Sequence, residues 1–308
     1  MKKIVALLII IAMSAMLFAC GNAAVGGTTA STATESPQSS TTFTLPAPGA
    51  KAPEPYADID FVNGSVADSK GKILLEIKTN GTAQAASTEE VSVDFMGYKK
   101  TFSVLRIKNT GTWVKGVFSD MNGASEMDAF VEESGGFTVE AFYVDNSDTG
   151  ANRGIVCCTE SVGGDGKRSG WGLAESAEGK PYFITGHTSE NVYSSVYGAK
   201  ASETEPVHVI AVYDAVSMRN SIYVNGNLVS SDRAAGRFTS ANKTEACEGF
   251  EMGNAFYIGA DPTGAAGKKE MCDFPSNDLT VLDVKFYNRA LTAEEVSAVF
   301  GEVIRSFG

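Results

Sequence analysis

The apolar and polar residues of this chain follow three patterns, and the first is a short apolar run at the N-terminus. Lys2 and Lys3 precede a nearly unbroken apolar stretch from Ile4 to Leu17. At about 1.5 Å per residue, a helix of this stretch would be about 21 Å long, too short for the ~30 Å hydrocarbon core of a bilayer. A basic start followed by a short apolar run is typical of a secretory signal peptide.

The second pattern is a polar segment with few large apolar side chains. Residues 21–55 contain eleven Ser or Thr and five of the nine prolines of the chain. Such a segment cannot bury enough apolar surface to offset the conformational entropy that ordering costs. We therefore expect a disordered stalk whose proline-rich end is the more extended part.

The third pattern begins at Tyr56 and consists of short runs rich in β-branched and aromatic residues. Gly, Asn and Asp separate these runs, which is typical of an all-β sandwich of two antiparallel sheets. The pair Asn225-Gly226 predicts a tight type I′ hairpin turn. The predicted strands are Lys72–Lys78, Val91–Met96, Phe102–Ile107, Phe137–Val144, Gly154–Cys158, Tyr182–Thr185, Val207–Tyr213, Ser221–Val224, Asn227–Ser230, Phe256–Gly259 and Leu279–Tyr287.

One helix is predicted, at the C-terminal end of the chain. Thr292 has the residue type of an N-cap, and Glu295 three positions later completes a capping box. Leu291 and Val296 have the spacing of a hydrophobic staple. We expect a short C-terminal helix that begins after Thr292.

Composition and charge argue against several classes of protein. The chain has 25 Lys and Arg against 37 Asp and Glu, a net charge of −12. We expect no nucleic-acid partner, because neutralising phosphates requires a basic surface. The two histidines leave few ligands for a histidine-based metal site. We interpret His187 as a solvated loop residue and His208 as a structural strand residue.

The apolar run ends in Leu17-Phe18-Ala19-Cys20-Gly21, which resembles the lipobox of bacterial lipoproteins. The resemblance implies cleavage before Cys20 and diacylation of its thiol, with a plain secretory signal as the alternative. Acyl chains contribute roughly 0.8 kcal/mol per buried methylene, so they would hold the protein at the membrane without a spanning helix. The expected location is the extracytoplasmic side of the bacterial cell membrane, with the lipid anchor as the only membrane contact.

Six motifs from residue 137 onward occur in an order that is specific to one family. They are Phe137–Phe142, Gly170–Leu173, His208–Asp214, Tyr223–Gly226, Tyr257–Asp261 and Val284–Val296. The series resembles the laminin-G-like jelly roll of the concanavalin A-like superfamily. The resemblance implies a two-sheet antiparallel jelly-roll sandwich over residues 56–308, after a signal peptide (1–19) and a lipidated stalk (20–55).

The same superfamily contains glycoside hydrolases, so a catalytic carboxylate pair is an alternative. Glu126–Glu132 resembles the acidic signature of laminarinase-like enzymes, but its last glutamate falls one or two residues late. In an extended strand, Glu126 and Glu132 would lie about 20 Å apart, whereas a retaining glycosidase needs about 5–5.5 Å. We interpret this segment as a solvated acidic stretch.

Aromatic side chains are the candidates for a glycan site, because the apolar face of a sugar packs on a ring. Four of them fall in one stretch of the chain: Trp171, Tyr182, Tyr193 and Tyr197. Tyr193 and Tyr197 lie in a polar stretch between predicted strands, and we expect them to form an exposed platform. For Tyr193 and Tyr197, folding back onto the sandwich is the alternative. Packing in the core or at an edge is the alternative for Tyr182, and for Trp171 it is the favoured interpretation.

Calcium is the one metal that the sequence leaves open. The loop 145–152 supplies hard oxygen donors, among them Asp145 and Asp148, and calcium prefers such ligands. An acidic surface loop without metal is the alternative, and we expect no other cofactor.

Four cysteines remain after Cys20. The laminin-G-like resemblance implies a disulfide late in the chain, and Cys247 and Cys272 flank one of the last predicted strands. Cys157 and Cys158 are adjacent in an apolar strand, where their side chains point to opposite faces. We interpret these two as buried thiols.

Together these observations predict a cell-surface lipoprotein that displays a non-catalytic jelly-roll module for a glycan or an extracellular protein. Two alternatives remain open: a glycoside hydrolase or lyase of the same superfamily, and a structural spacer domain. Carboxyl pairs in a concave cleft would favour hydrolysis, whereas aromatic rings on an open face would favour binding.

Overall fold

The computed structural model describes residues 51–62, 65–109, 111–119, 126–147, 150–161, 168–187, 192–200, 205–238, 255–261 and 278–308. All of them belong to the compact unit Thr41–Gly308. Within these ranges, no helix combines the length and the apolar character that crossing a membrane requires. The predicted signal peptide, Cys20, Asp148 and the predicted pair Cys247 and Cys272 lie outside the described residues.

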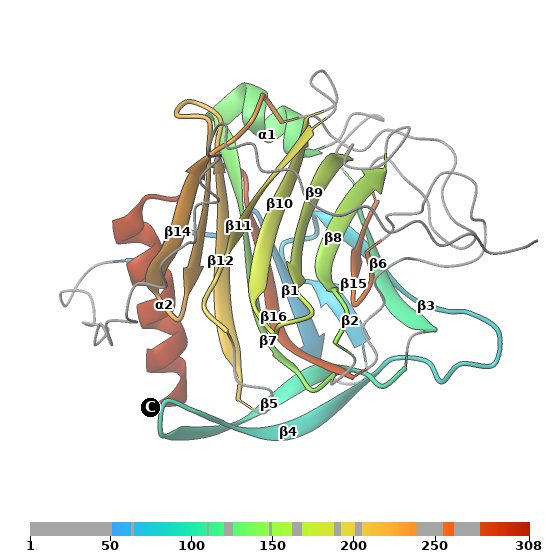
Figure 1. Ribbon diagram of the computed structural model, residues 1–308. Helices are drawn as coiled ribbons and strands as arrows, with labels where there is room; N and C mark the ends of the chain where they lie inside the picture. The colour runs from blue at the N-terminus through green and yellow to red at the C-terminus, as the bar shows by residue number, and fades with distance from the viewer. Residues whose placement is uncertain are drawn as a thin grey trace, which may run out of the picture. The chain divides into compact units, whose positions relative to one another are not determined.

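The described residues form two antiparallel sheets, which confirms the predicted two-sheet sandwich (Figure 1). The nine-stranded sheet contains β1 (Ala57–Val62), β2 (Ser65–Asp68), β4 (Ser87–Phe95), β5 (Tyr98–Ile107), β7 (Gly136–Asp145), β12 (Val207–Asp214), β13 (Arg219–Val224), β14 (Asn227–Arg233) and β16 (Leu279–Tyr287). The seven-stranded sheet contains β3 (Ile73–Thr79), β6 (Thr112–Phe118), β8 (Arg153–Ser161), β9 (Arg168–Glu175), β10 (Pro181–His187), β11 (Val192–Tyr197) and β15 (Ala255–Ile258).

The order of the strands in each sheet mixes distant parts of the chain. The main path of the nine-stranded sheet is β14-β13-β12-β7-β16-β1-β2, and the β4–β5 hairpin joins it where β5 pairs with β16. The seven-stranded sheet has the order β11-β10-β9-β8-β15-β6-β3, so β11 is an edge strand. Strands β1, β2, β6, β9 and β11 are additions to the predicted set.

The core lies between the two sheets and is built from alternate residues of each strand. On β7, the inward residues are Phe137, Val139, Ala141 and Tyr143. Aromatic side chains of the other sheet, such as Phe183, close the core from the opposite side. Because the outward face of β7 is covered as well, this strand is buried along almost its whole length rather than at alternate residues.

The predicted C-terminal helix is confirmed as α2 (Ala293–Phe307). Thr292 is its N-cap, and both hydrogen bonds of the capping box with Glu295 are present. The helix packs on the outward face of the nine-stranded sheet, as Figure 1 shows for the red helix beside β12 and β14. Val296 and Val299 bury their side chains there, so the amphipathic face of the helix determines which part of the sheet is covered.

A second helix, α1 (Glu126–Ser134), corrects the interpretation of the acidic segment. Met127, Phe130 and Val131 are buried, and this i, i+3, i+4 spacing is the helical signal that the acidic residues concealed. The separation estimated for an extended strand is therefore wrong, because six residues of helix rise only about 9 Å. The segment is not a solvated stretch, since one face of α1 packs against the core.

The predicted Asn225-Gly226 turn is confirmed, because both residues have positive φ, 48° and 76°. The β4–β5 hairpin uses the same device at Met96 and Gly97, with φ of 54° and 83°. Cys157 and Cys158 are buried thiols, as predicted.

Candidate functional site

The tyrosine surface lies on the outward face of the edge strand β11, and we define it by Tyr182, Tyr193, Ser195 and Tyr197. Tyr193 is 45% exposed and Tyr197 is 50% exposed. Between them along the strand, Val196 points the other way and is buried in the core. The period of two in a strand therefore places both tyrosines on one face, about 13 Å apart.

The neighbouring strand β10 supports one of these rings and leaves space beside the other. Tyr182 lies directly opposite Tyr197, and the two ring centroids are 5.4 Å apart at an interplanar angle of 32°. Tyr182 is only 8% exposed, so its ring is mostly buried and the Tyr197 ring packs on it. Opposite Tyr193 stands Gly186, which has no side chain to fill the adjacent surface.

The structure changes one of the sequence interpretations and decides between two alternatives for Trp171. Tyr193 and Tyr197 are exposed as expected, but they lie on a strand rather than in a polar loop. Trp171 is 2% exposed and packs against Phe137 and Phe286 in the core, which leaves it no surface to offer a ligand.

The interpretation of His187 as a solvated residue is wrong. Its side chain is fully buried on β10, next to the Thr185 hydroxyl at 3.4 Å from Nε2. Burial lowers the pKa of His187, so the neutral ring is the favoured form. Polar residues follow His187 in the sequence, so the sequence did not show that its side chain points inward at the end of β10.

The calcium candidate Asp145 belongs to a buried ion cluster at one end of β7. Its carboxylate accepts a hydrogen bond from Arg153 Nε, and Arg153 Nη2 donates to Glu175 Oε1 at 3.1 Å. The Tyr143 hydroxyl donates to Glu175 Oε2 at 3.2 Å. Burial and the charge of Asp145 raise the pKa of Glu175 to about 7, because one guanidinium serves two carboxylates. In this arrangement the Asp145 carboxylate is already neutralised by Arg153.

Within the described ranges, no three His, Cys, Asp or Glu side chains are grouped closely enough to hold a metal ion. The second calcium candidate, Asp148, is outside these ranges.

A second ion cluster lies beneath α2, on the outward face of the nine-stranded sheet. His208 Nε2 lies 2.8 Å from Glu140 Oε1, and the Tyr287 hydroxyl donates to Glu140 Oε2 at 2.7 Å. Lys285 forms ion pairs with Asp283 and with Glu140, the latter at 3.9 Å. His208 is therefore a structural strand residue, as predicted.

The two carboxylates of this cluster have opposite pKa shifts. Burial alone would raise the pKa of Glu140, but Lys285 and the hydrogen bonds from His208 and Tyr287 lower it to about 2. Burial raises the pKa of Asp283 to about 7 against the attraction of Lys285. A cavity of about 580 Å³ adjoins the cluster between α2 and the sheet.

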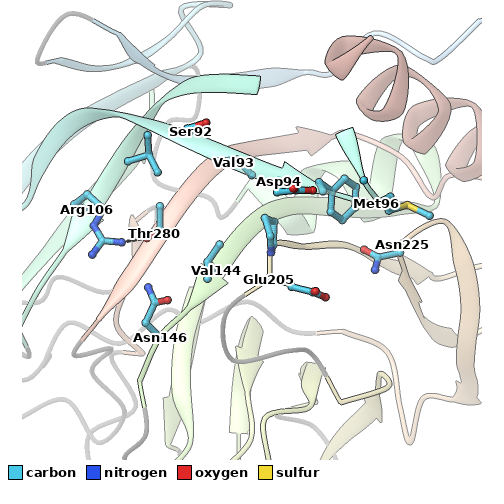
Figure 2. A pocket seen from close by; sticks show the side chains of 14 residues that line it. Ser92, Val93, Asp94, Met96, Arg106, Val144, Asn146, Glu205, Asn225 and Thr280 are labelled. Carbon is cyan, nitrogen blue, oxygen red and sulfur yellow. Dashed lines mark hydrogen bonds between the residues drawn. The ribbon is translucent and has the colours of Figure 1, made fainter. Parts of the chain in front are cut away.

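Another cavity, of about 630 Å³, lies beside β4, and no motif in the sequence points to it. It is lined by consecutive residues of β4 and its turn and, across from them, by Val144, Asn146, Glu205, Pro206 and Asn225 (Figure 2). These residues come from segments far apart in the sequence, so only the folded chain brings them together.

With this geometry in place, the family of the chain is clear. Residues 118–297, more than half of the chain, match the family model described as the concanavalin A-like lectin/glucanases superfamily. The chain belongs to this superfamily. No curated protein matches the chain in sequence.

Solved structures with the same fold are found among the binding domains of botulinum neurotoxins. The receptor-binding domain of type G is 11% identical with a TM-score of 0.51, and the match covers 82% of this chain and 52% of that chain. The binding domain of serotype D is 12% identical with a TM-score of 0.52, covering 81% and 52%.

A third such structure is the binding domain of botulinum neurotoxin DC in complex with rat synaptotagmin II. It is 11% identical with a TM-score of 0.52, and the match covers 81% of this chain and 52% of that chain. The chain thus matches about half the length of these structures, and at this identity the likeness establishes the fold alone.

Proposed function

We propose that this chain is a bacterial cell-surface lipoprotein whose jelly-roll domain binds a glycan without catalysis, through the tyrosine surface. The observation that carries the proposal is the exposure of Tyr193 and Tyr197 on one face of the edge strand β11. Large rings left half exposed on the same face form a platform for a ligand with an apolar side.

The chemistry of the tyrosine surface suits a sugar. The apolar face of a pyranose packs on an aromatic ring, while its hydroxyls find the phenolic groups and the Ser195 hydroxyl between the two tyrosines. Because Tyr182 stacks against Tyr197, the Tyr197 ring loses little freedom when a ligand binds. The spacing of the rings along β11 requires a ligand longer than a single sugar.

A protein ligand is the second candidate. One solved structure that shares the fold is the binding domain of botulinum neurotoxin DC in complex with a protein, rat synaptotagmin II. Tyrosine is also favoured at protein interfaces. A protein that occupied the tyrosine surface would require the same two rings.

The hydrolase alternative has its best carboxylate pair in Glu140 and Asp283. Their split pKa values suit a general acid and an ionised partner, and a cavity adjoins them. However, Lys285 contacts both carboxylates, and the oxygens of Glu140 are engaged by His208 and Tyr287. An ammonium between the two groups occupies the position that a glycosidic bond would need, so the arrangement favours a structural role.

Membrane attachment through Cys20 is part of the proposal. After cleavage, residues 20–55 would form the stalk, and the acidic body would be repelled by anionic headgroups and stand away from the bilayer. Cys20→Ala should block acylation and leave the unprocessed precursor. Membrane retention with labelled fatty acid still incorporated would contradict the lipid anchor.

A glycan array tests the binding proposal. The wild-type chain is compared with the double variant Tyr193→Ala/Tyr197→Ala, which should bind at least about fivefold more weakly to any glycan that the wild type retains. Tyr98→Ala is the matched control, because Tyr98 is 49% exposed but lies on β5 of the other sheet. Equal glycan binding by the double variant would exclude the tyrosine surface, and release of reducing sugar would favour the hydrolase.

A further inference from the structure

The β4 strand has an open edge within the described part of the chain. It pairs with β5 along its whole length, from Ser87 opposite Arg106 to Phe95 opposite Tyr98. No described strand pairs with its other side. An edge strand presents unpaired main-chain N–H and C=O groups, which is a template for another strand.

The register shows which main-chain groups are unpaired. The two-residue turn at Met96-Gly97 closes on the pair Phe95 and Tyr98, and in antiparallel pairs hydrogen-bonded and non-bonded positions alternate. The main-chain groups of Val93 therefore bond to β5, whereas those of Ser92 and Asp94 point away from it. No described residue makes a main-chain hydrogen bond to Ser92 or Asp94 on that side.

The cavity of about 630 Å³ lies along this open edge. Figure 2 shows Ser92, Val93, Asp94 and Met96 along the hairpin, with Val144 on the neighbouring strand and Glu205 beyond it. Val93 and Val144 form an apolar strip in the floor of this otherwise largely polar groove, beside the free main-chain groups of β4. This combination fits an extended peptide, whose main chain would pair with β4 while alternate side chains face the floor.

The charge of the groove selects the peptide. Asp94 and Glu205 are exposed carboxylates without an ion-pair partner among the described residues. The one cation of the lining, Arg106, is neutralised by Glu89 at 3.1 Å and Asp278 at 3.2 Å. Lys99 lies opposite Asp94 on β5 but does not line the groove, so the charge of the described lining is negative and favours basic side chains.

From these observations we propose that β4 binds an extended basic peptide by strand addition. The main chain of the peptide pairs with Ser92 and Asp94, and its Lys or Arg side chains, at alternate positions, meet the carboxylates of Asp94 and Glu205. This site lies on the nine-stranded sheet and shares no residue with the tyrosine surface, so it stands independently of the proposed glycan binding.

The decisive variant is Ser92→Pro. Proline removes the N–H that points into the groove, and it is tolerated at an edge position where that N–H is not used within the sheet. Ser92→Ala is the matched control, because it changes the same side chain and keeps the N–H. The probe is a fluorescein-labelled peptide of about eight alternating valine and lysine residues, followed by fluorescence anisotropy on the full chain.

Wild type and Ser92→Ala should bind this peptide equally, whereas Ser92→Pro should bind about tenfold more weakly at an unchanged melting temperature. If Ser92→Pro does not fold, the double variant Asp94→Asn/Glu205→Gln replaces it, since both residues are exposed. That variant should weaken binding of the lysine peptide and reduce its salt dependence, with no gain for a matched valine–glutamate peptide.

Three results would overturn the proposal. Equal peptide affinity of wild type and folded Ser92→Pro would exclude strand addition. Absence of saturable binding, or a preference for the glutamate peptide, would exclude a basic ligand. Self-association of the chain that Ser92→Pro abolishes, without peptide binding, would assign the edge to a second copy of this chain.

Discussion

The two sheets of the sandwich both carry large apolar side chains on their outward faces, but they differ in what covers them. On the nine-stranded sheet, Phe142 is buried beneath the β4–β5 hairpin and α2, and Ile210 and Val212 are buried beneath α2. At the β10–β11 edge of the seven-stranded sheet, Tyr193 and Tyr197 remain half exposed.

This difference separates side chains that stabilise the fold from side chains that are available to a ligand. Full burial of a large apolar side chain contributes about 1.5–3 kcal/mol, and the covered face collects this contribution from several residues. The tyrosine surface leaves much of the same kind of area in water. A ligand that covers the tyrosine surface would therefore bury apolar area that folding leaves exposed, and this burial would favour binding.

The covered face of the nine-stranded sheet also contains buried charged side chains, which must be paired, whereas charged side chains on an open face are solvated. Glu140 is buried with His208, Lys285 and Tyr287 as partners, and each partner comes from a strand of the same sheet. Burying a carboxylate is tolerated only when its oxygens are paired. Because α2 covers this network, replacing a single partner of Glu140 should destabilise the fold.

The largest effect on stability is expected for Phe300→Ala, which removes a central side chain of α2 from its packing on the nine-stranded sheet. Phe300 is fully buried and packs against Phe95 and the His208 ring. The lost contacts and the cavity left behind should lower the free energy of unfolding by about 3–5 kcal/mol, measured by urea denaturation. Val216→Ala is the control, since Val216 is highly exposed, and a similar loss there would contradict the comparison.

A smaller loss is expected for Lys285→Met. Without its ammonium, Glu140, Asp283 and Asp58 face one another with no cation, which should cost about 2–3 kcal/mol at neutral pH. Lys78→Met removes only the surface ion pair with Glu76 and should change stability by less than about 0.5 kcal/mol. Equal losses of unfolding free energy in the two variants, measured by urea denaturation, would show that the buried ion pairs of Lys285 contribute no more to stability than the surface ion pair of Lys78.

The pH dependence of stability should be changed by Asp283→Asn. The pKa of Asp283 is raised to about 7 in the fold, above its ordinary value of 3.8, so the folded state holds the proton more tightly than the unfolded state. The stability from this proton is present below about pH 4 and is lost as the pH rises through 7. Wild type should lose about 1–2 kcal/mol of unfolding free energy between pH 5 and 8 that the Asn variant does not lose.

Glu175 provides the comparison within the core, because its pKa is also raised to about 7 but α2 does not cover it. Glu175→Gln should remove a separate share of the pH dependence, and the two shares should add in the double variant. A pH profile unchanged by both substitutions would contradict the proposed proton binding.

The smallest effect on stability is expected at the tyrosine surface. Tyr193→Ala should change the free energy of unfolding by less than about 0.5 kcal/mol, and Tyr197→Ala by about 0.5–1.5 kcal/mol because its ring packs on Tyr182. Tyr182→Ala should cost more, since this ring is mostly buried beneath Tyr197. A loss of several degrees in the melting temperature of the Tyr193→Ala variant would assign its ring to packing.

Local sequence was sufficient wherever the interacting residues are close along the chain. The Asn225-Gly226 turn needs only two residues that accept positive φ, and the capping box of α2 needs only Thr292 and Glu295. Alternation and turn residues predicted the two-sheet sandwich, and β16 has the predicted bounds. These features depend on backbone geometry, which neighbouring residues determine.

Only the tertiary structure determined which faces of the sheets are covered and which remain exposed. An alternating pattern shows that a strand has two faces, but not that α2, formed at the end of the chain, covers β12, or that Tyr193 stands on an uncovered edge. It also gave no sign that His187 points inward, or that Glu140 and Lys285 would meet across two strands. Such contacts join residues far apart in sequence, and only chain closure into the sandwich selects them.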